Sequence, residues 1–371
     1  MTTNQIYSLV NSVNSQAFGS AALTATDTST LISLGNNVLA SNNNTEAFLN
    51  VLAQRIGRTI LRFREYRNKL DDMVLNDFEY GAILQKLKVE MPIAEQDESY
   101  GLTNGASVDH YVVAKPDVIQ KLFVTRTPYQ YKITIQRSTL KEAFLSVDAM
   151  GAFIGTVFGE VRNAIEVSLE NLGRITVATA IAEASKVAGR VVNLLTEYNA
   201  ETSLSLTADV AIHTPDFMAF CIARMNQVRD GMQDMSEVYN DGTTATFTPA
   251  EDMRVRVASL FERRLQTVVQ YAAFHDEFVK FDGKYTTINY WQAEQSPLNV
   301  NIVTPSDSTA TSVTDVVAII ADRDAMGIYK IDEEVSTTPL NSAGLYYNTY
   351  YHEKQLWFLD LSENFVIFRL A

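Results

Sequence analysis

The chain has 371 residues, of which 46% are apolar and 20% charged. This is ordinary globular usage and excludes a globally disordered chain. The net charge of −14 argues against a protein that grips nucleic acid through a broad basic face. One cysteine and four histidines exclude a disulfide framework and a cysteine zinc cluster, and they leave few ligands for a metalloenzyme. Composition therefore favours a non-catalytic role.

Residues 1–45 are almost uncharged. They are rich in Ser, Thr, Asn and Ala, and Asp27 is their single charged side chain. The first basic residue is Arg55, so neither a secretory signal nor a transit peptide is expected. The apolar stretch 149–159 is shorter than the roughly 18 residues that a bilayer span needs. We expect a soluble cytoplasmic protein whose residues 1–45 form an arm on a partner surface; a partly ordered terminus is the alternative.

A basic helix is expected next, over about 46–71, within an N-terminal segment 46–77. Apolar residues from Phe48 to Phe63 recur there at helical spacing. The remaining faces carry the densest basic cluster of the chain: Arg55, Arg58, Arg62, Arg64, Arg67 and Lys69. A solvated face is one interpretation, and contact with phosphate or with an acidic neighbouring subunit is the other.

Period-two alternation then predicts two strands. Leu87, Val89 and Met91 alternate with charged residues, and a second alternation covers 129–135. Between them lies the long polar stretch 95–115. A two-stranded arm with so long a connection is marginally stable alone, which indicates that it lies on a partner.

The longest helical pattern covers about 148–186. At 1.5 Å per residue such a helix spans roughly 50 Å or more. Gly151, Gly155 and Gly159 lie four residues apart, which predicts close backbone packing on that face. A second lobe is expected over 203–338, with a buried strand near 316–320. Three strands are expected at the C-terminus: 345–351, 355–361 and 365–370. The fold class is therefore α+β.

Catalytic motifs are missing from the sequence. We find no phosphate-binding glycine loop, nucleophile elbow, zinc-binding H-E-x-x-H or EF-hand pattern. Cys221 with His213 or His275 is a possible nucleophile pair, but Cys221 lies in an apolar helical stripe, which favours a buried structural thiol. The acids of 275–277 and 322–324 are candidates for metal ligands or a general acid–base pair, but the sequence pattern is not specific, and helix or turn surface is the preferred interpretation. We predict no catalytic, cofactor or metal site.

The order of these elements resembles the major capsid proteins of tailed double-stranded DNA bacteriophages, which have the Hong Kong 97-like fold. The resemblance covers nearly the whole chain and includes local texture such as the Ala-Asp-Arg-Asp-Ala-Met-Gly run at 321–327. It implies an extended loop at 78–137, a peripheral domain with a spine helix at 138–202 and 339–371, and an axial domain at 203–338.

The resemblance also implies a function and partners. The expected function is self-assembly into hexamers and pentamers of an icosahedral shell around double-stranded DNA, in the host cytoplasm and without enzymatic activity. The expected partners are other copies of the chain, a separate scaffolding protein, a portal protein and weakly contacted DNA. The candidate subunit-interface residues are Gly101, Asn104, Gly105, Asp109, Arg55, Arg58 and Arg62. The alternatives are an encapsulin-like nanocompartment shell and, more distantly, a hydrolase that uses Cys221 or the acids near His275.

Overall fold

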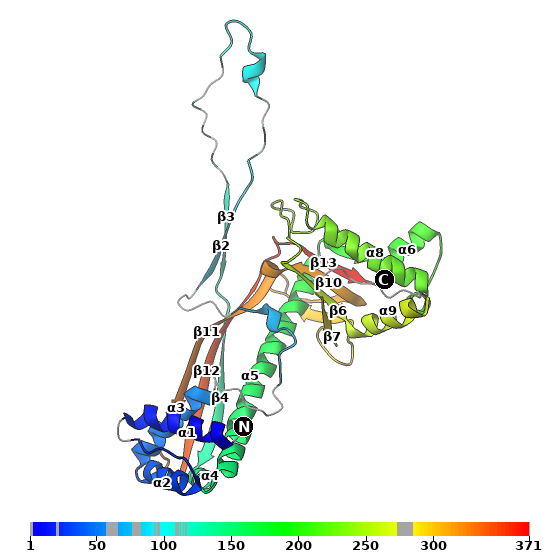
Figure 1. Ribbon diagram of the computed structural model, residues 1–371. Coiled ribbons are helices and arrows are strands. Elements are labelled where there is room, and N and C mark those ends of the chain that lie inside the picture. The colour runs from blue at the N-terminus through cyan, green and yellow to red at the C-terminus, as the bar shows by residue number, and fades with distance from the viewer. Residues whose placement is uncertain are drawn as a thin grey trace. The chain divides into compact units, whose positions relative to one another are not determined.

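The computed structural model describes residues 3–19, 22–56, 66–75, 83–92, 94, 97–107, 111, 113, 115, 117–272 and 285–370. The chain forms two compact units, and both combine helices with sheets, as the α+β prediction requires (Figure 1). Unit 1 comprises residues 1–80, 126–177 and 327–357. Unit 2 comprises residues 81–125, 178–326 and 358–371. The predicted long helix is confirmed as α5 (Val147–Ala184), whose residues up to 177 belong to unit 1.

The expectation of an arm over residues 1–45 is wrong for the described part of this segment. It forms α1 (Thr3–Phe18), α2 (Thr28–Leu39) and the start of α3 (Asn42–Ile56). Their apolar stripes are buried in one core with α4 (Arg137–Ala143) and the first half of α5. Asp27, the one charged residue, caps α2 by accepting a hydrogen bond from the Thr30 amide at 2.8 Å. The described part of residues 1–45 is therefore helical and packed in the core of unit 1, and it is not an extended segment.

The basic helix is confirmed only in part. Helix α3 ends at Ile56, residues 57–65 lie outside the described residues, and 66–68 are not helical. The chain continues through a 3₁₀ turn, η2 (Asp71–Met73), into the short strand β1 (Val74–Leu75). Tyr66 is held against α5, because its hydroxyl donates a 2.5 Å hydrogen bond to Glu170.

Unit 1 contains a four-stranded sheet in the order β1-β11-β12-β4. Its strands are β4 (Arg126–Gln136), β11 (Met326–Thr337) and β12 (Tyr346–Leu359), besides β1. The alternation at 129–135 is thus a strand, but it pairs with β12, from Arg126 opposite Leu356 to Gln136 opposite Tyr346. The two strands expected at 345–351 and 355–361 are one continuous strand, β12.

Unit 2 contains a five-stranded sheet in the order β5-β13-β10-β6-β7. Its strands are β5 (Val191–Asn193), β6 (Met253–Ala258), β7 (Tyr285–Ile288), β10 (Val316–Asp322) and β13 (Phe365–Arg369). Strand β10 is buried along its whole length, as predicted. The last strand, β13, pairs with β10, so it belongs to unit 2 and not to the same unit as most of β12. The boundaries expected at 202 and 339 therefore differ from those of the structure, at 177 and 357.

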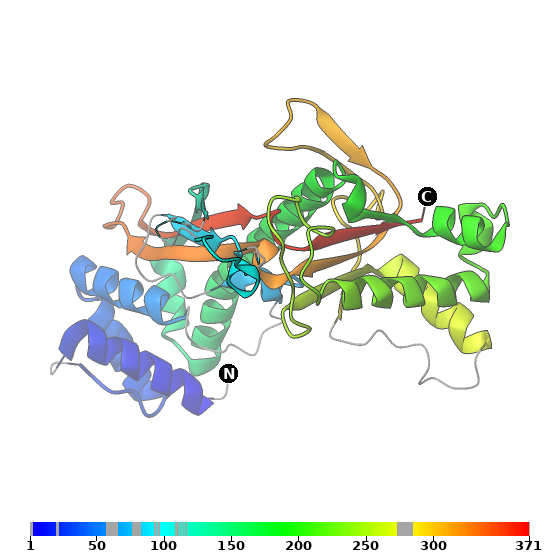
Figure 2. The ribbon, with the colours of Figure 1, turned by 90° about the horizontal axis from the view of Figure 1, so that it is seen from above.

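Helices and short turns complete unit 2. Helix α8 (Pro215–Gly231) begins at the predicted Thr214-Pro215 signal and packs beside α9 (Ser259–Ala272), as Figure 2 shows. Further elements of unit 2, besides those of the extended loop, are η4 (Ala188–Arg190), α6 (Leu194–Thr202), α7 (Ala208–Ala211), β8 (Val300–Val303), β9 (Ala310–Val313) and η6 (Arg323–Ala325).

The glycines of α5 have a different role from the predicted backbone packing. A Cβ atom at Gly151 would lie 2.9 Å from Cδ1 of Ile6, so this glycine admits a side chain of α1. A Cβ atom at Gly159 would meet nothing within 4 Å. The four-residue spacing therefore does not mark one shared packing face.

Candidate assembly site on the extended loop

The extended loop begins and ends in a two-stranded ribbon within unit 2. Strands β2 (Leu84–Val89) and β3 (Val118–Phe123) pair antiparallel, from Leu84 opposite Phe123 to Val89 opposite Val118 (Figure 1). The prediction that 129–135 is the returning strand of the loop is therefore wrong. Both β3 and β4 alternate, and periodicity alone does not say which one pairs with β2.

Alternation gives the ribbon two different faces. We call residues Gln85, Leu87, Val89, Val118, Gln120 and Leu122 the outer face; all six are exposed. Its four apolar side chains are between 54% and 60% exposed. Side chains of this kind gather in one patch because β2 and β3 are in register. In a single subunit this patch is in contact with water, which is unfavourable.

The inner face consists of Leu84, Lys86, Lys88, Ile119, Lys121 and Phe123, all partly buried. The ring of Phe123 packs on that of Phe358, with centroids 5.6 Å apart. The three lysines point toward the turn between β12 and β13. The inner face thus holds the ribbon on unit 2, and the outer face is left without an intramolecular cover.

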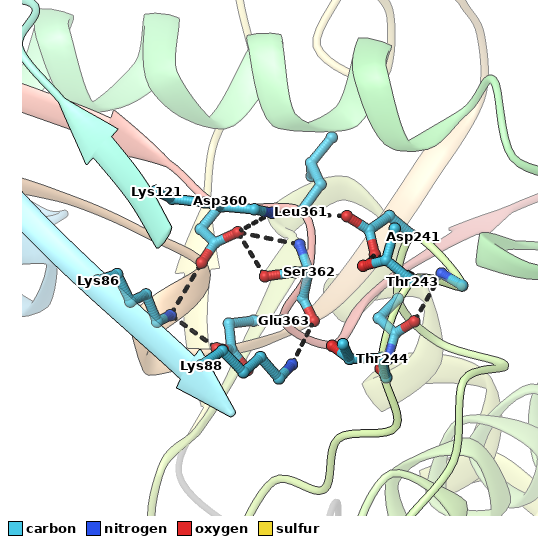
Figure 3. A network of polar contacts seen from close by, with 12 residues as sticks. Lys86, Lys88, Lys121, Asp241, Thr243, Thr244, Asp360, Leu361, Ser362 and Glu363 are labelled. Atoms are coloured by element: carbon cyan, nitrogen blue, oxygen red, sulfur yellow. Dashed lines mark hydrogen bonds and ion pairs between the residues drawn. The ribbon is translucent and has the colours of Figure 1, made fainter. Parts of the chain in front are cut away.

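The lysines meet three carboxylates in an arrangement that we call the lysine clamp: Lys86, Lys88, Lys121, Asp241, Asp360 and Glu363 (Figure 3). Lys86 Nζ lies 3.0 Å from Asp360 Oδ2 and 2.7 Å from Glu363 Oε1. Lys121 Nζ lies 2.9 Å from Asp360 Oδ1 and 3.5 Å from Asp241 Oδ2. Lys88 Nζ donates to the carbonyl oxygen of Ser362 at 3.3 Å. One carboxylate, Asp360, therefore connects both strands of the ribbon to the body.

Asp360 is buried in the turn between β12 and β13, and its carboxylate is hydrogen-bonded there. Its side chain is fully buried, and Oδ1 accepts hydrogen bonds from the amide of Ser362 at 3.0 Å and from its hydroxyl at 2.7 Å. Burial by itself raises the pKa of Asp360. The hydrogen bond from Lys121, the charge of Lys86 and the bonds from Ser362 outweigh burial and hold this pKa well below its ordinary value. Asp360 is therefore ionised at neutral pH.

A buried arginine lies behind the carboxylates. Arg190, at the end of η4, is fully buried and donates from Nε to the carbonyl oxygen of Asn240 at 2.8 Å and from Nη2 to that of Leu361. It thus holds the two loops that carry Asp241 and Asp360. Burial lowers the pKa of Arg190, while the charges of Asp241 and Asp360 act in the opposite direction.

Lys86 and Lys88 differ in how far nearby acids offset the effect of burial on the pKa of the side chain. Burial opposes the charge of Lys86, but its contacts with Glu363 and Asp360 raise its pKa overall. Burial lowers the pKa of Lys88, and the nearby acids offset this only in part. By their ion-pair distances to Asp360, Lys86 and Lys121 are the principal cationic contacts of the clamp.

The sequence-predicted interface residues lie beyond the ribbon. Gly101 ends the 3₁₀ turn η3 (Glu98–Gly101), and Asn104 and Gly105 form a turn; residues 101–107 are all exposed. Gly105 has φ +92°, a conformation that favours glycine. Asp109, Arg58 and Arg62 lie outside the described residues, and so does the side chain of Arg55. Their role at an interface stays a prediction.

Sequence reasoning missed the clamp. Alternation placed Lys86 and Lys88 on one face of a strand, which is a usable signal. The acids that receive the lysines are far away in sequence; Lys121 and Asp360 are separated by 239 positions. No local sequence pattern predicts a contact between residues so far apart.

The candidate catalytic residues have structural roles where the structure describes them. Cys221 is fully buried in α8, and burial raises the pKa of its thiol, which disfavours the nucleophilic thiolate. Asp322 is buried, so its interpretation as a surface residue is wrong. Its carboxylate accepts from the Thr248 hydroxyl and the Asp324 amide, both at 2.7 Å. His275 lies outside the described residues. Within the described part of the chain, no cluster of metal-binding side chains occurs and no helix is long and apolar enough to cross a membrane.

Comparison with known proteins decides the family. The family model described as Phi29-like phage major capsid protein matches residues 8–369. The chain belongs to this family. It is 23% identical to the major capsid protein of Bacillus phage PZA over 98% of this chain and 72% of that relative.

Solved structures agree on the fold. The capsid structure of Staphylococcus phage Andhra matches with a TM-score of 0.51 at 11% identity, covering 84% of this chain and 87% of that one. A chain from a structure of the head fiber and inner core protein of native bacteriophage P68 matches with a TM-score of 0.50 at 10% identity, with the same coverage of 84% and 87%. The protein is thus a phage major capsid protein with the Hong Kong 97-like fold. The comparisons give no support to the nanocompartment or hydrolase alternatives.

Proposed function

We propose that the chain assembles with copies of itself into hexamers and pentamers of an icosahedral shell around double-stranded DNA, and that the outer face of the ribbon docks on a neighbouring subunit. The observation that carries this proposal is the patch formed by Leu87, Val89, Val118 and Leu122, whose side chains are more than half exposed in one subunit. Membership of a capsid protein family makes a second copy of the chain the natural partner.

The energy available from this patch is substantial. Full burial of one such side chain stabilises by roughly 1.5–3 kcal/mol, so covering the exposed half of four amounts to about 3–6 kcal/mol. In a closed shell each subunit docks its ribbon on one neighbour and is contacted by the ribbon of another. The free energy of this contact is therefore contributed once per subunit around the shell. The contact also stabilises the ribbon itself, since an isolated two-stranded sheet is marginally stable.

The charge of the protein supports the remaining part of the proposal. A net charge of −14 keeps a lining of such subunits from holding packaged DNA tightly, because tight binding would need many phosphate contacts from lysine and arginine. We further propose two partners, a separate scaffolding protein and a portal protein. Assembly takes place in the host cytoplasm under this proposal. The resemblance of element order to tailed-phage capsid proteins supports these partners.

A double substitution on the outer face tests the docking role. We expect Leu87→Asn with Leu122→Asn to leave the subunit folded, since exposed side chains contribute within about 0.5 kcal/mol to stability. Circular dichroism and thermal unfolding check the fold. Negative-stain microscopy and sedimentation, alone and with the scaffolding protein, should show that shells are lost.

The matched control changes the polar positions of the same face. Gln85→Ser with Gln120→Ser leaves the four apolar side chains in place, so shells should form as with the unmodified chain. Normal shells from the Leu87→Asn, Leu122→Asn variant would show that the outer face is not the docking surface.

A further inference from the structure

We infer that the lysine clamp positions the ribbon for assembly and that Asp360 is its central positioning residue. The inference rests on the proposed docking of the outer face. It assigns a role to the opposite side of the same two strands, which contacts the chain's own body and not the neighbour.

The geometry of the ribbon connects the two faces. Residues of the inner face alternate with those of the outer face along both strands, so the orientation of one sets the orientation of the other. Asp360 receives Lys86 from β2 on one carboxylate oxygen and Lys121 from β3 on the other. A single buried group therefore fixes both strands at once and prevents rotation of the ribbon about either of them.

The turn that carries Asp360 is hydrogen-bonded to the body of unit 2. The amide of Asp360 donates to the carbonyl oxygen of Ala325 at 2.7 Å, and Asn364 donates to the hydroxyl of Thr248 at 3.1 Å. The turn between β12 and β13 is thus tied to the core of unit 2. The side chains of Lys86 and Lys121 are only 26% and 33% exposed, so their pairing is less screened than an ordinary surface salt bridge.

The turn that carries Asp360 keeps its own hydrogen bonds when the ribbon detaches. Without the lysines, Asp360 still accepts from the amide and the hydroxyl of Ser362, and Arg190 still donates to the carbonyl oxygen of Leu361. We infer that an unclamped subunit keeps its sheet but presents the outer face in varying directions, which lowers the rate of productive docking.

Hydrogen exchange and assembly together test this role in the full chain. For Asp360→Asn we expect backbone amides of β2 and β3 to exchange roughly tenfold faster or more, while those of β10 and β13 keep their protection. The rate of shell formation at fixed subunit concentration should fall, and shells of irregular size should appear. The control is Asp332→Asn, which breaks the exposed Lys354–Asp332 pair (3.1 Å) in unit 1 and should change neither measurement.

Variants on the ribbon separate positioning from folding. Lys86→Met with Lys121→Met removes the two lysine charges that contact Asp360 and leaves Asp360 with its Ser362 hydrogen bonds, so it should reproduce the faster exchange and slower assembly. Lys121→Arg keeps the charge and should behave as the unmodified chain. If Asp360→Asn also exposes β10 and β13, the lysine double variant decides; unchanged ribbon exchange in that variant overturns the inference.

The two proposals fail in distinguishable ways. A loosened ribbon that still assembles at the normal rate contradicts the positioning role of Asp360 and leaves outer-face docking intact. Normal shells from Leu87→Asn, Leu122→Asn contradict docking, whatever the clamp variants do.

Discussion

At the scale of single residues, one close contact in unit 1 lies between α2 and the end of α4. A Cβ atom at Gly35 would lie 2.5 Å from Cβ of Phe144, which is too close for two non-bonded carbon atoms. Phe144 is buried and packs on Phe48, with ring centroids 5.5 Å apart. Because the clash involves the root of the side chain, rotation of the ring does not relieve it. The helices must move apart.

We therefore expect Gly35→Ala to lower the free energy of unfolding by roughly 1–3 kcal/mol, the usual cost of overpacking. Urea denaturation of the unassembled subunit measures it. The matched control is Gly159→Ala, also within a helix, where a Cβ atom meets nothing within 4 Å. It should be neutral or stabilise by up to about 1 kcal/mol through helix propensity. Equal effects at both positions would contradict the packing argument.

A buried acid in β12 gives a pH-dependent prediction. Glu353 is 6% exposed and accepts a hydrogen bond from Gln355 at 3.1 Å. Burial raises its pKa, the charges of Glu333 and Glu166 add to this, and Lys330 and Gln355 oppose it. Above this raised pKa both folded and unfolded states are ionised, and the folded state carries the full burial penalty. As the pH falls through the raised pKa toward 4.5, the penalty disappears.

Glu353→Gln should thus raise the free energy of unfolding at pH 7, and the gain should shrink as the pH is lowered through that window. Denaturation curves at several pH values measure the effect. Glu334→Gln, at an exposed position of β11, serves as the control and should change stability little at any pH. A gain for Glu353→Gln that is independent of pH would speak against the burial penalty as its cause.

At the scale of elements, the extended loop separates into a clamped ribbon and a distal connection. Residues 101–107 are all exposed, and Tyr100 is 92% exposed. Such residues gain little stabilisation from contacts within their own subunit. Because Val89 and Val118 face each other in register, an Asn-Gly turn can join them directly.

We expect replacement of residues 90–117 by Asn-Gly to leave the ribbon, the clamp and the thermal midpoint unchanged within about 2 °C. Shell formation should be lost, since the predicted interface residues Gly101, Asn104, Gly105 and Asp109 are removed. Calorimetry and electron microscopy check the two parts. Closed shells from this shortened chain would show that residues 90–117 are not required for assembly and that docking involves the ribbon alone.

Element types were more predictable than their pairing. The helical stripe of α5 and the apolar run of β10 both appear in the structure as expected. The alternation of β4 was read correctly as a strand, but its partner was not. Periodicity reports which face of an element is buried, and it carries no information on the element that buries it. Residues 1–45 show the same limit, since α1 and α2 have apolar stripes that an unusual lack of charge concealed.

At the scale of the whole molecule, the acidic charge and the scarcity of cysteine and histidine suit a structural subunit. The family comparison and the order of elements agree on a phage major capsid protein. The exposed apolar outer face of the ribbon fits the proposed docking on a neighbouring subunit.

The sequence by itself determined the α+β class, the long helix, the two-faced strand β2 and the resemblance to capsid proteins. These follow from local spacing, which fixes the preference of a segment for one conformation and one buried face. Only the tertiary structure decided that β3 pairs with β2, that β4 pairs with β12, and that Lys86 and Lys121 both contact Asp360. Such contacts join residues more than 200 positions apart in the last case, and their energy exists only once the chain has folded.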